Sequence, residues 1–194
     1  METEPKLEAP GAGLPFFEAL VLRYYVKPFV MKKFSWDQSM SFLKSEGEKI
    51  LILIGDVSDE DANKKILVQR IRGLEDSSRY WSIAMVLEHI LIVTNAIRSV
   101  ILDLSNQKKT LVFVDIAKVK PKGGKPWQEL KAEFKQMMQS EIGGLSSLAR
   151  DKNSKLSHEH PWFGQMNTKE WAFLIGAHLR IHRQQVKQIV DQLK

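Results

Sequence analysis

Apolar residues recur at three- and four-residue intervals over much of the chain, and this spacing is typical of helices with one buried face. The clearest case lies between Ser78 and Leu104. There the apolar positions form one row, made of Ile83, Val86, Leu87, Ile90, Val93, Ile97, Val100, Ile101 and Leu104. The pattern predicts a long core helix over this segment.

Two further helices have recognisable starts. Ser35 is placed to cap a helix that runs from Trp36 to about Ile54, because serine accepts hydrogen bonds from the first backbone N–H groups. Near the end of the chain, Asn167 and Glu170 have the spacing of a capping box. We therefore expect a last helix from this point to the C-terminus.

The remaining segments complete an all-α fold. They predict a helix that starts at Leu14 or Pro15 and is kinked or ended by Pro28, a short helix from Ser58 to Ile71, a brief strand at Thr110–Val114 within a crossover over 106–126, and a helix over Trp127–Ser140. The sum is a four-helix bundle with an extra N-terminal helix and a longer crossover connection. Residues 1–13 read as a flexible leader, and residues 14–194 as a single helical domain.

Composition limits the chemistry. At 194 residues, with 43% apolar and 27% charged residues, the chain is long enough for one well-buried core. It contains no cysteine, which excludes disulfides, zinc ribbons, iron–sulfur clusters and thiol nucleophiles. Any metal must be held by nitrogen and oxygen ligands.

The N-terminus lacks the basic and apolar start of a secretory signal. The two most apolar stretches, Leu14–Met31 and Ile83–Leu104, are interrupted by charged residues and by His89, so we predict no stable membrane insertion. A cytoplasmic location follows as the expectation.

The net charge of +6 permits an acidic partner. The densest basic group lacks interleaved stacking aromatics, which favours a solvated loop over a nucleic-acid footprint; it comprises Lys108, Lys109, Lys118, Lys120, Lys122 and Lys125. We predict no nucleic-acid partner. The aromatic and basic stretch 23–34 resembles an interfacial membrane helix, but covering the bundle or forming a homodimer contact is the more ordinary use.

Two histidines fall inside the apolar stripe of the last helix. His178 and His182 are four residues apart, so their side chains lie one above the other on one face. Imidazoles directed into a core destabilise it by about 1–3 kcal/mol for each polar group left without a partner. The pair therefore needs either hydrogen-bond partners or a metal ion.

His89 lies at the edge of the buried stripe of the helix over 78–104. If the two helices are neighbours, all three imidazoles can meet at one point. Three neutral histidines leave a divalent ion its full +2 charge and one open position, as in catalytic metal sites. The alternative is that these are core histidines satisfied by hydrogen bonds, and the spacing alone does not separate the two.

Other polar residues have functional and ordinary interpretations side by side. His160, before Pro161, either lines the mouth of a metal cleft or packs in a turn against its aromatic neighbours. Gln185 lies one turn beyond the histidine pair and either supports it or bonds to a neighbouring helix. The glutamates with helical spacing receive no catalytic role, because surface or capping positions explain them; they are Glu88, Glu129, Glu133 and Glu170.

Two stretches resemble the DinB/YfiT-like superfamily of metalloenzymes. The sequence from Trp81-Ser82 to His89-Ile90 is similar to the histidine-bearing helix of that superfamily. The C-terminal part resembles the signature of an uncharacterised DinB-like branch, in which a His-Pro-x-Phe-Gly turn precedes a Glu-Trp helix start and a His-x-x-x-His pair; here these are residues 160–164, 170–171 and 178–182. Together the matches bracket residues 75–194.

The resemblance implies a bundle whose metal ligands are His89, His178 and His182, with zinc or nickel as the ion. It also implies a metal-dependent enzyme that transfers a low-molecular-weight thiol or hydrolyses a small-molecule substrate. The alternative is a non-enzymatic metal-binding or partner-binding helical module. The extra N-terminal helix and the lysine-rich crossover depart from the family pattern and leave the substrate open.

Overall fold

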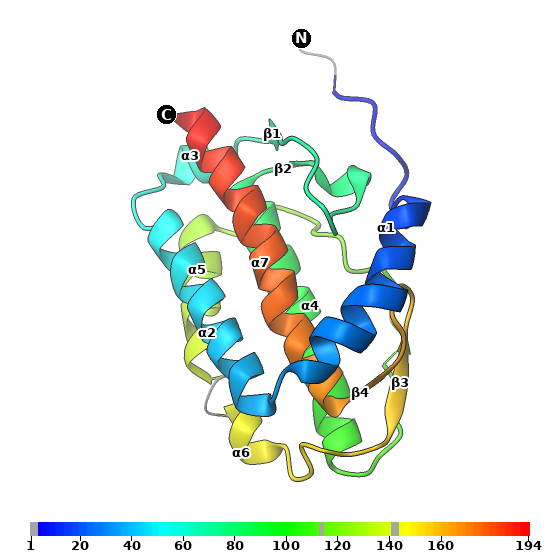
Figure 1. Cartoon of the computed structure of the whole chain (residues 1–194). Helices are drawn as coiled ribbons and strands as arrows, with labels where there is room; N and C mark the ends of the chain where they lie inside the picture. The colour runs from blue at the N-terminus through cyan, green and yellow to red at the C-terminus, as the bar shows by residue number, and fades with distance from the viewer. Residues whose placement is uncertain (1–3, 113–114, 141–143) are drawn as a thin grey trace.

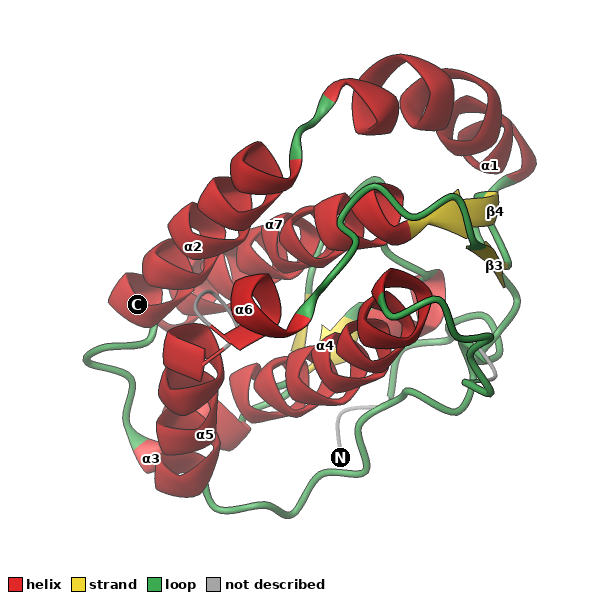
Figure 2. Ribbon diagram, turned by 90° about the horizontal axis from the view of Figure 1, so that it is seen from below, coloured by secondary structure: helices red, strands yellow, loops and turns green. Residues whose placement is uncertain are grey.

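The computed structural model describes residues 4–112, 115–140 and 144–194. Its framework is four long helices: α2 (Trp36–Leu53), α4 (Ile83–Ser105), α5 (Trp127–Ser140) and α7 (Thr168–Leu193). Helix α7 contacts α2 and α4, and α5 contacts the same two helices, so the four close into a ring (Figures 1 and 2). The predicted four-helix bundle is confirmed.

The predicted helix starts are confirmed by their caps. The Ser35 hydroxyl accepts the N–H of Gln38 at 3.1 Å, and the Asn167 side chain accepts the N–H of Glu170 at 3.1 Å, each within a full capping box. Helix α4 begins at Ile83, the first residue of the apolar row, and so starts later than the predicted boundary at Ser78. The Ser82 hydroxyl caps it.

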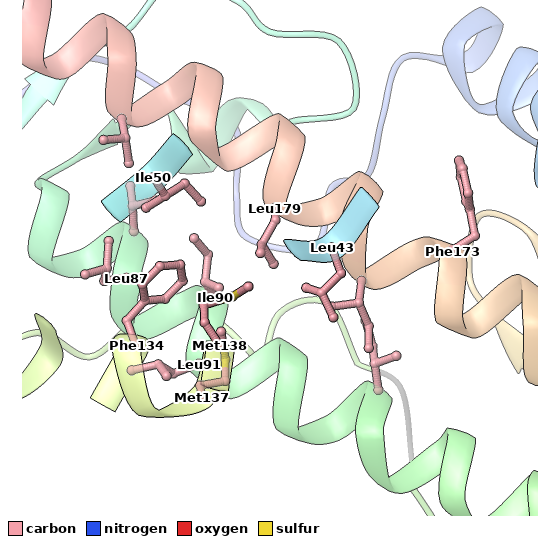
Figure 3. Packing of buried hydrophobic residues seen from close by; sticks show 14 of the residues in the cluster. Leu43, Ile50, Leu87, Ile90, Leu91, Phe134, Met137, Met138, Phe173 and Leu179 are labelled. Atoms are coloured by element: carbon pink, nitrogen blue, oxygen red, sulfur yellow. The ribbon is translucent and has the colours of Figure 1, made fainter. Parts of the chain in front are cut away.

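The bundle core is built from the facing sides of all four helices. Figure 3 shows side chains from α2, α4, α5 and α7 meeting between the ribbons, among them Leu43, Ile50, Leu87, Phe134 and Leu179. All five are fully buried. Burying each such side chain stabilises the fold by about 1.5–3 kcal/mol, which makes this core the main source of stability.

Helix α4 is 23 residues long and apolar enough to cross a membrane by length and composition. The sequence interpretation that this stretch is too interrupted for a span is therefore wrong by that measure. In the bundle, α4 packs against both α5 and α7, and its buried positions include the polar residues His89 and Thr94. Its apolar character is explained by the bundle core.

The short helix predicted for Ser58–Ile71 is wrong beyond its first turn. Helix α3 covers only Asp59–Asn63, and strand β1 (Ile66–Leu67) follows. Strand β1 pairs antiparallel with β2 (Tyr80–Trp81), which comes after the short 3₁₀ helix η3 (Asp76–Ser78). This pairing leads the chain directly into α4.

A second antiparallel pair, absent from the sequence prediction, leads into α7. Strand β3 (Ser157–His160) pairs with β4 (Gly164–Asn167), and the single-turn helix α6 (Ser146–Leu148) precedes them. The turn between the strands contains Pro161, Trp162 and Phe163. It brings the predicted turn histidine, His160, to the start of the last helix.

The N-terminal helix continues past Pro28. It begins as α1 (Phe16–Val21), widens into the π-helix η1 (Leu22–Val30) and ends in the 3₁₀ helix η2 (Met31–Lys33). The hydrogen bonds of a π-helix run over five residues instead of four, so the α-helical pattern that a proline interrupts is already replaced before Pro28. Figure 1 shows α1 beside the bundle.

The leader and the crossover both lie against the start of α4. The backbone N–H groups of Gly11 and Gly13 donate to the Glu75 carboxylate at 3.5 and 2.9 Å. Thr110–Val112 form no strand, and Phe113 and Val114 lie outside the described residues. Further along the crossover, the Gly123 N–H donates to Glu88 of α4 at 2.8 Å. The division at residue 13 stays a prediction.

Candidate metal centre

The three predicted histidines meet at one point between α4 and α7. The ring centroid of His89 lies 5.0 Å from that of His178 and 4.7 Å from that of His182, and the last two are 4.4 Å apart. One ligand atom from each ring lies within 4.8 Å of the others. This histidine triad is a cluster that could hold a metal ion.

Antiparallel pairing of the two helices produces this meeting point. Ser78 contacts Gln185, Trp81 contacts His182, and His89 contacts His178. The residue numbers rise along the first segment while they fall along α7, so the two run in opposite directions. The four-residue spacing on α7 then places both of its histidines on the side that faces α4. The predicted helix neighbours and the predicted convergence are both found.

The crossover fixes the protonation of His89. Its Nδ1 lies 2.7 Å from the backbone carbonyl oxygen of Val119. A carbonyl only accepts, so in the neutral ring Nδ1 carries the hydrogen and donates it. The other ring nitrogen, Nε2, keeps its lone pair and is free to act as a ligand.

Gln185 fixes the position of the ring hydrogen of His182. Its amide nitrogen donates to the backbone carbonyl of Ser78 at 2.7 Å, so its amide oxygen faces His182 Nδ1, 2.8 Å away. That oxygen accepts the Nδ1 hydrogen, which leaves the lone pair on Nε2. Gln185 therefore both supports the histidine pair and bonds to another segment, so the two uses considered from the sequence are both correct.

His178 completes the set. Its Nε2 lies 3.1 Å from Nε2 of His89, and its Nδ1 is buried without a hydrogen-bond partner. Two nitrogen ligands bound to one tetrahedral zinc at 2.0–2.1 Å would be roughly 3.3 Å apart. The donor set and the 3.1 Å spacing of the two Nε2 atoms fit a divalent ion.

Burial keeps the triad uncharged. Loss of hydration lowers the pKa of His89 to about 4, against which the Val119 hydrogen bond acts only in part. Burial likewise holds the pKa of His178 and His182 well below the usual value, and the neighbouring histidines lower both further. Neutral imidazoles with available lone pairs are the form that binds metal.

An aromatic and ionic layer surrounds the triad. The indole of Trp81 stacks on His182 with ring planes 7° apart and centroids 6.2 Å apart. Lys120 Nζ lies 5.4 Å from the centre of that indole and donates to Glu75 at 2.6 Å and to the Ser78 hydroxyl at 2.8 Å. Burial would raise the pKa of Glu75, but the bond and charge of Lys120 hold it below its usual value.

The triad opens into a cavity of about 410 Å³. Its walls come from α4, α7, the π-helix η1, the crossover and the turn after β3. His160 lines this cavity, and its ring also packs against Trp162 and Phe163, with centroids 5.8 and 5.1 Å away. Both interpretations of this residue from the sequence are therefore correct.

The four glutamates set aside in the sequence do not line the cavity among the described residues. Glu88 accepts N–H groups of the crossover, Glu133 pairs with Lys125, and Glu170 closes the capping box of α7. Glu129 lies 3.5 Å from Lys125. Each has a structural partner.

Sequence reasoning missed the site residues that come from loops. The Val119 carbonyl, the Lys120 ammonium and the Glu75 carboxylate belong to irregular segments, and no periodicity marks them. The sequence pattern groups Lys120 with solvated lysines, yet only 17% of its side-chain surface is exposed. Trp81 could have been found from the sequence, because it belongs to the stretch that resembles the superfamily helix.

Comparison with known proteins agrees with the fold. A crystal structure described as TT2238, a four-helix bundle protein, has a TM-score of 0.52 with this chain at 18% identity, covering 79% of this chain and 98% of that one. At this identity the likeness concerns the fold alone. None of the curated proteins matches the chain. Residues 43–186, which include all three histidines of the triad, match the DinB superfamily, and the chain belongs to that family.

Proposed function

We propose that this protein is a metal-dependent enzyme in which His89, His178 and His182 bind one divalent ion, zinc or nickel. The observation that carries the proposal is the meeting of three neutral imidazoles, with one ligand nitrogen from each within 4.8 Å of the others, at the wall of a cavity. A divalent ion held by three neutral ligands keeps its +2 charge and lowers the pKa of a thiol or water bound at its open position.

The surroundings favour a thiol over water as the nucleophile. A metal-bound water attacks best when a nearby general base takes a proton from it, whereas a thiol loses its proton on binding the metal and needs no such base. The acidic residues that line the described part of the cavity are Glu18, Glu75 and Asp115. All are engaged: Glu18 by Arg70, Glu75 by Lys120 and Asp115 by Lys118. Transfer of a small thiol is the reaction that the site supports best.

Metal analysis tests the binding half of the proposal. We expect about one ion per chain in protein purified without a polyhistidine tag, and loss of most of it in His89→Ala, His178→Ala and His182→Ala. His158→Gln is the matched control, because His158 lies on β3 outside the triad. Equal metal content in all five proteins would overturn the proposal.

A thiol screen tests the catalytic half. Small thiols are mixed with a chromogenic electrophile and with metal-loaded protein, metal-free protein or His178→Ala. We expect faster conjugation only with the loaded wild type. If the ion binds with the expected stoichiometry but no thiol reacts faster, the non-enzymatic metal-binding module becomes the better description.

A further inference from the structure

The cavity extends well beyond the triad along α4. Starting at His89, its lining residues on this helix are Val93, Ala96, Ile97 and Val100. At a rise of 1.5 Å per residue, the row from His89 to Val100 is about 16 Å long. The triad therefore lies at one end of an elongated space.

The other walls repeat this direction and are apolar as well. On α7 the lining runs from the two histidines back toward the start of the helix through Ala177 and Leu174. The π-helix η1 covers the space with Leu22 and Val26, four residues apart on one face. Aliphatic walls of this kind attract a ligand by removing its apolar surface from water.

We propose that the substrate which reaches the triad carries an elongated aliphatic tail, and that this tail lies in the cavity along α4. The inference rests on the proposed function, since it places the reacting end of the substrate at the triad. The length of the row, its aliphatic lining and the position of the ligating nitrogens at one end argue for this class rather than for a compact polar molecule.

The experiment measures the affinity of n-alkanethiols, from ethanethiol to decanethiol, for the Co²⁺-substituted protein by thiolate-to-cobalt absorption in the near ultraviolet. Each buried methylene should strengthen binding about fourfold. We expect this increase to continue over several carbons and to stop once the tail fills the cavity. An affinity that does not change with chain length would overturn the inference.

A substitution that fills the cavity, paired with a control on the same helical turn, tests where the tail lies. Ala96→Phe places a large side chain in the row, so the gain in affinity from butanethiol to decanethiol should be lost. Asn95→Phe adds the same bulk on the exposed side of the same helical turn and should behave as wild type. If Ala96→Phe keeps the full dependence on chain length, the tail lies elsewhere.

A metal-free measurement separates this inference from the proposed function. The fluorescent apolar dye N-phenyl-1-naphthylamine should bind the metal-free wild type and Asn95→Phe, and bind Ala96→Phe at least tenfold more weakly. Absence of Co²⁺ binding together with normal dye binding would reject the proposed function only. Co²⁺ and ethanethiol binding without dye binding or chain-length dependence would reject the elongated tail only.

Discussion

In the triad, His89 and His182 each have the position of the ring hydrogen set by a hydrogen-bond partner. The Val119 carbonyl fixes His89, and the Gln185 amide, itself held by the Ser78 carbonyl, fixes His182. Both bonds leave the lone pair on Nε2 of the ring, and His89 Nε2 lies 3.1 Å from Nε2 of His178. The imidazoles are thus oriented for a ligand before any ligand arrives, which reduces the cost of binding.

The amide of Gln185 should therefore control metal affinity. Replacing it in Gln185→Leu keeps the size of the side chain but removes the acceptor for His182, and loss of such a partner typically weakens binding about 10–100-fold. Competition with a chromophoric chelator measures the effect. Gln184→Leu, at the exposed neighbouring position, should bind as wild type. Equal affinity in the two variants would mean that Gln185 does not position the ligand.

His160 should contribute to the pH dependence of stability. Burial lowers its pKa to about 3, while an unfolded histidine has a pKa near 6.5. Between these values the unfolded chain binds a proton that the folded chain does not, so stability is present above pH 6.5 and is lost as the pH falls. One such group changes the free energy of unfolding by up to about 1.4 kcal/mol per pH unit.

Urea denaturation of metal-free protein at pH 7, 6, 5 and 4 measures this dependence. His160→Gln should show a shallower loss of stability than wild type, while Ser157→Ala, which changes a non-titrating residue of the same hairpin, should follow wild type. Parallel curves for wild type and His160→Gln would show that His160 takes up its proton in the folded state as well.

At the scale of the elements, what the sequence predicts well is what periodicity and capping encode. Helices α2, α4, α5 and α7 have apolar rows or capping residues, and all four are found. The strands carry no comparable signal because they are two to four residues long, too short to show alternation. The acidic start at Ser58 suggests a helix that continues to Ile71, yet Ile66 pairs with Trp81 across two strands. That partner is fixed by tertiary contacts, which local spacing does not contain.

Close approach of α2 and α7 depends on Gly176. A Cβ placed there would lie 2.7 Å from the Phe42 ring and 3.1 Å from the backbone nitrogen of Leu43. Backbone cannot rotate away as a side chain can, so Gly176→Ala should force the helices apart and lower the free energy of unfolding by about 1–3 kcal/mol. Gly55→Ala, whose added carbon meets only ordinary contacts, should stay within about 0.5 kcal/mol of wild type.

Chemical denaturation of the two alanine variants, followed by circular dichroism, provides the measurement. Because the ring of four helices positions the triad, Gly176→Ala should also weaken metal binding, whereas Gly55→Ala should not. A Gly176→Ala protein as stable as Gly55→Ala would show that α2 and α7 can separate without loss of packing.

For the whole molecule, the wheel positions of the three histidines made a triad possible, and the resemblance to the DinB-like superfamily predicted it. The pairing of α4 with α7 brings the three histidines together. The cavity was not predictable in the same way. Its outer walls come from η1, the crossover and the β3–β4 turn, and the path of these segments depends on contacts such as the bond from Lys27 to the Phe163 carbonyl at 3.0 Å.

The outer surface of the N-terminal helix is apolar and exposed. Large apolar side chains remain exposed along it, namely Phe16, Phe17, Tyr24, Tyr25 and Phe29. The opposite side of the same helix lines the cavity through Leu22 and Val26. The first of the two uses considered from the sequence, covering the bundle, therefore accounts for the inner side, and a homodimer contact on the outer side stays a prediction.

Removal of the metal tests how the bundle and the site depend on each other. The core among α2, α4, α5 and α7 is complete without an ion, and in its absence the His89 and His178 nitrogens still lie within hydrogen-bond distance. We therefore expect chelated protein to keep its helical circular dichroism and to unfold cooperatively.

Bound metal should still raise the stability of the fold. A ligand at a hundred times its dissociation constant adds about 2.7 kcal/mol to the free energy of unfolding. For a chain of this size, that corresponds to a melting temperature roughly 5–10 °C higher in the loaded protein. Metal added back should restore the difference in wild type but not in His182→Ala. Unfolding on chelation would instead identify the ion as part of the core, as in small domains that fold only around their metal.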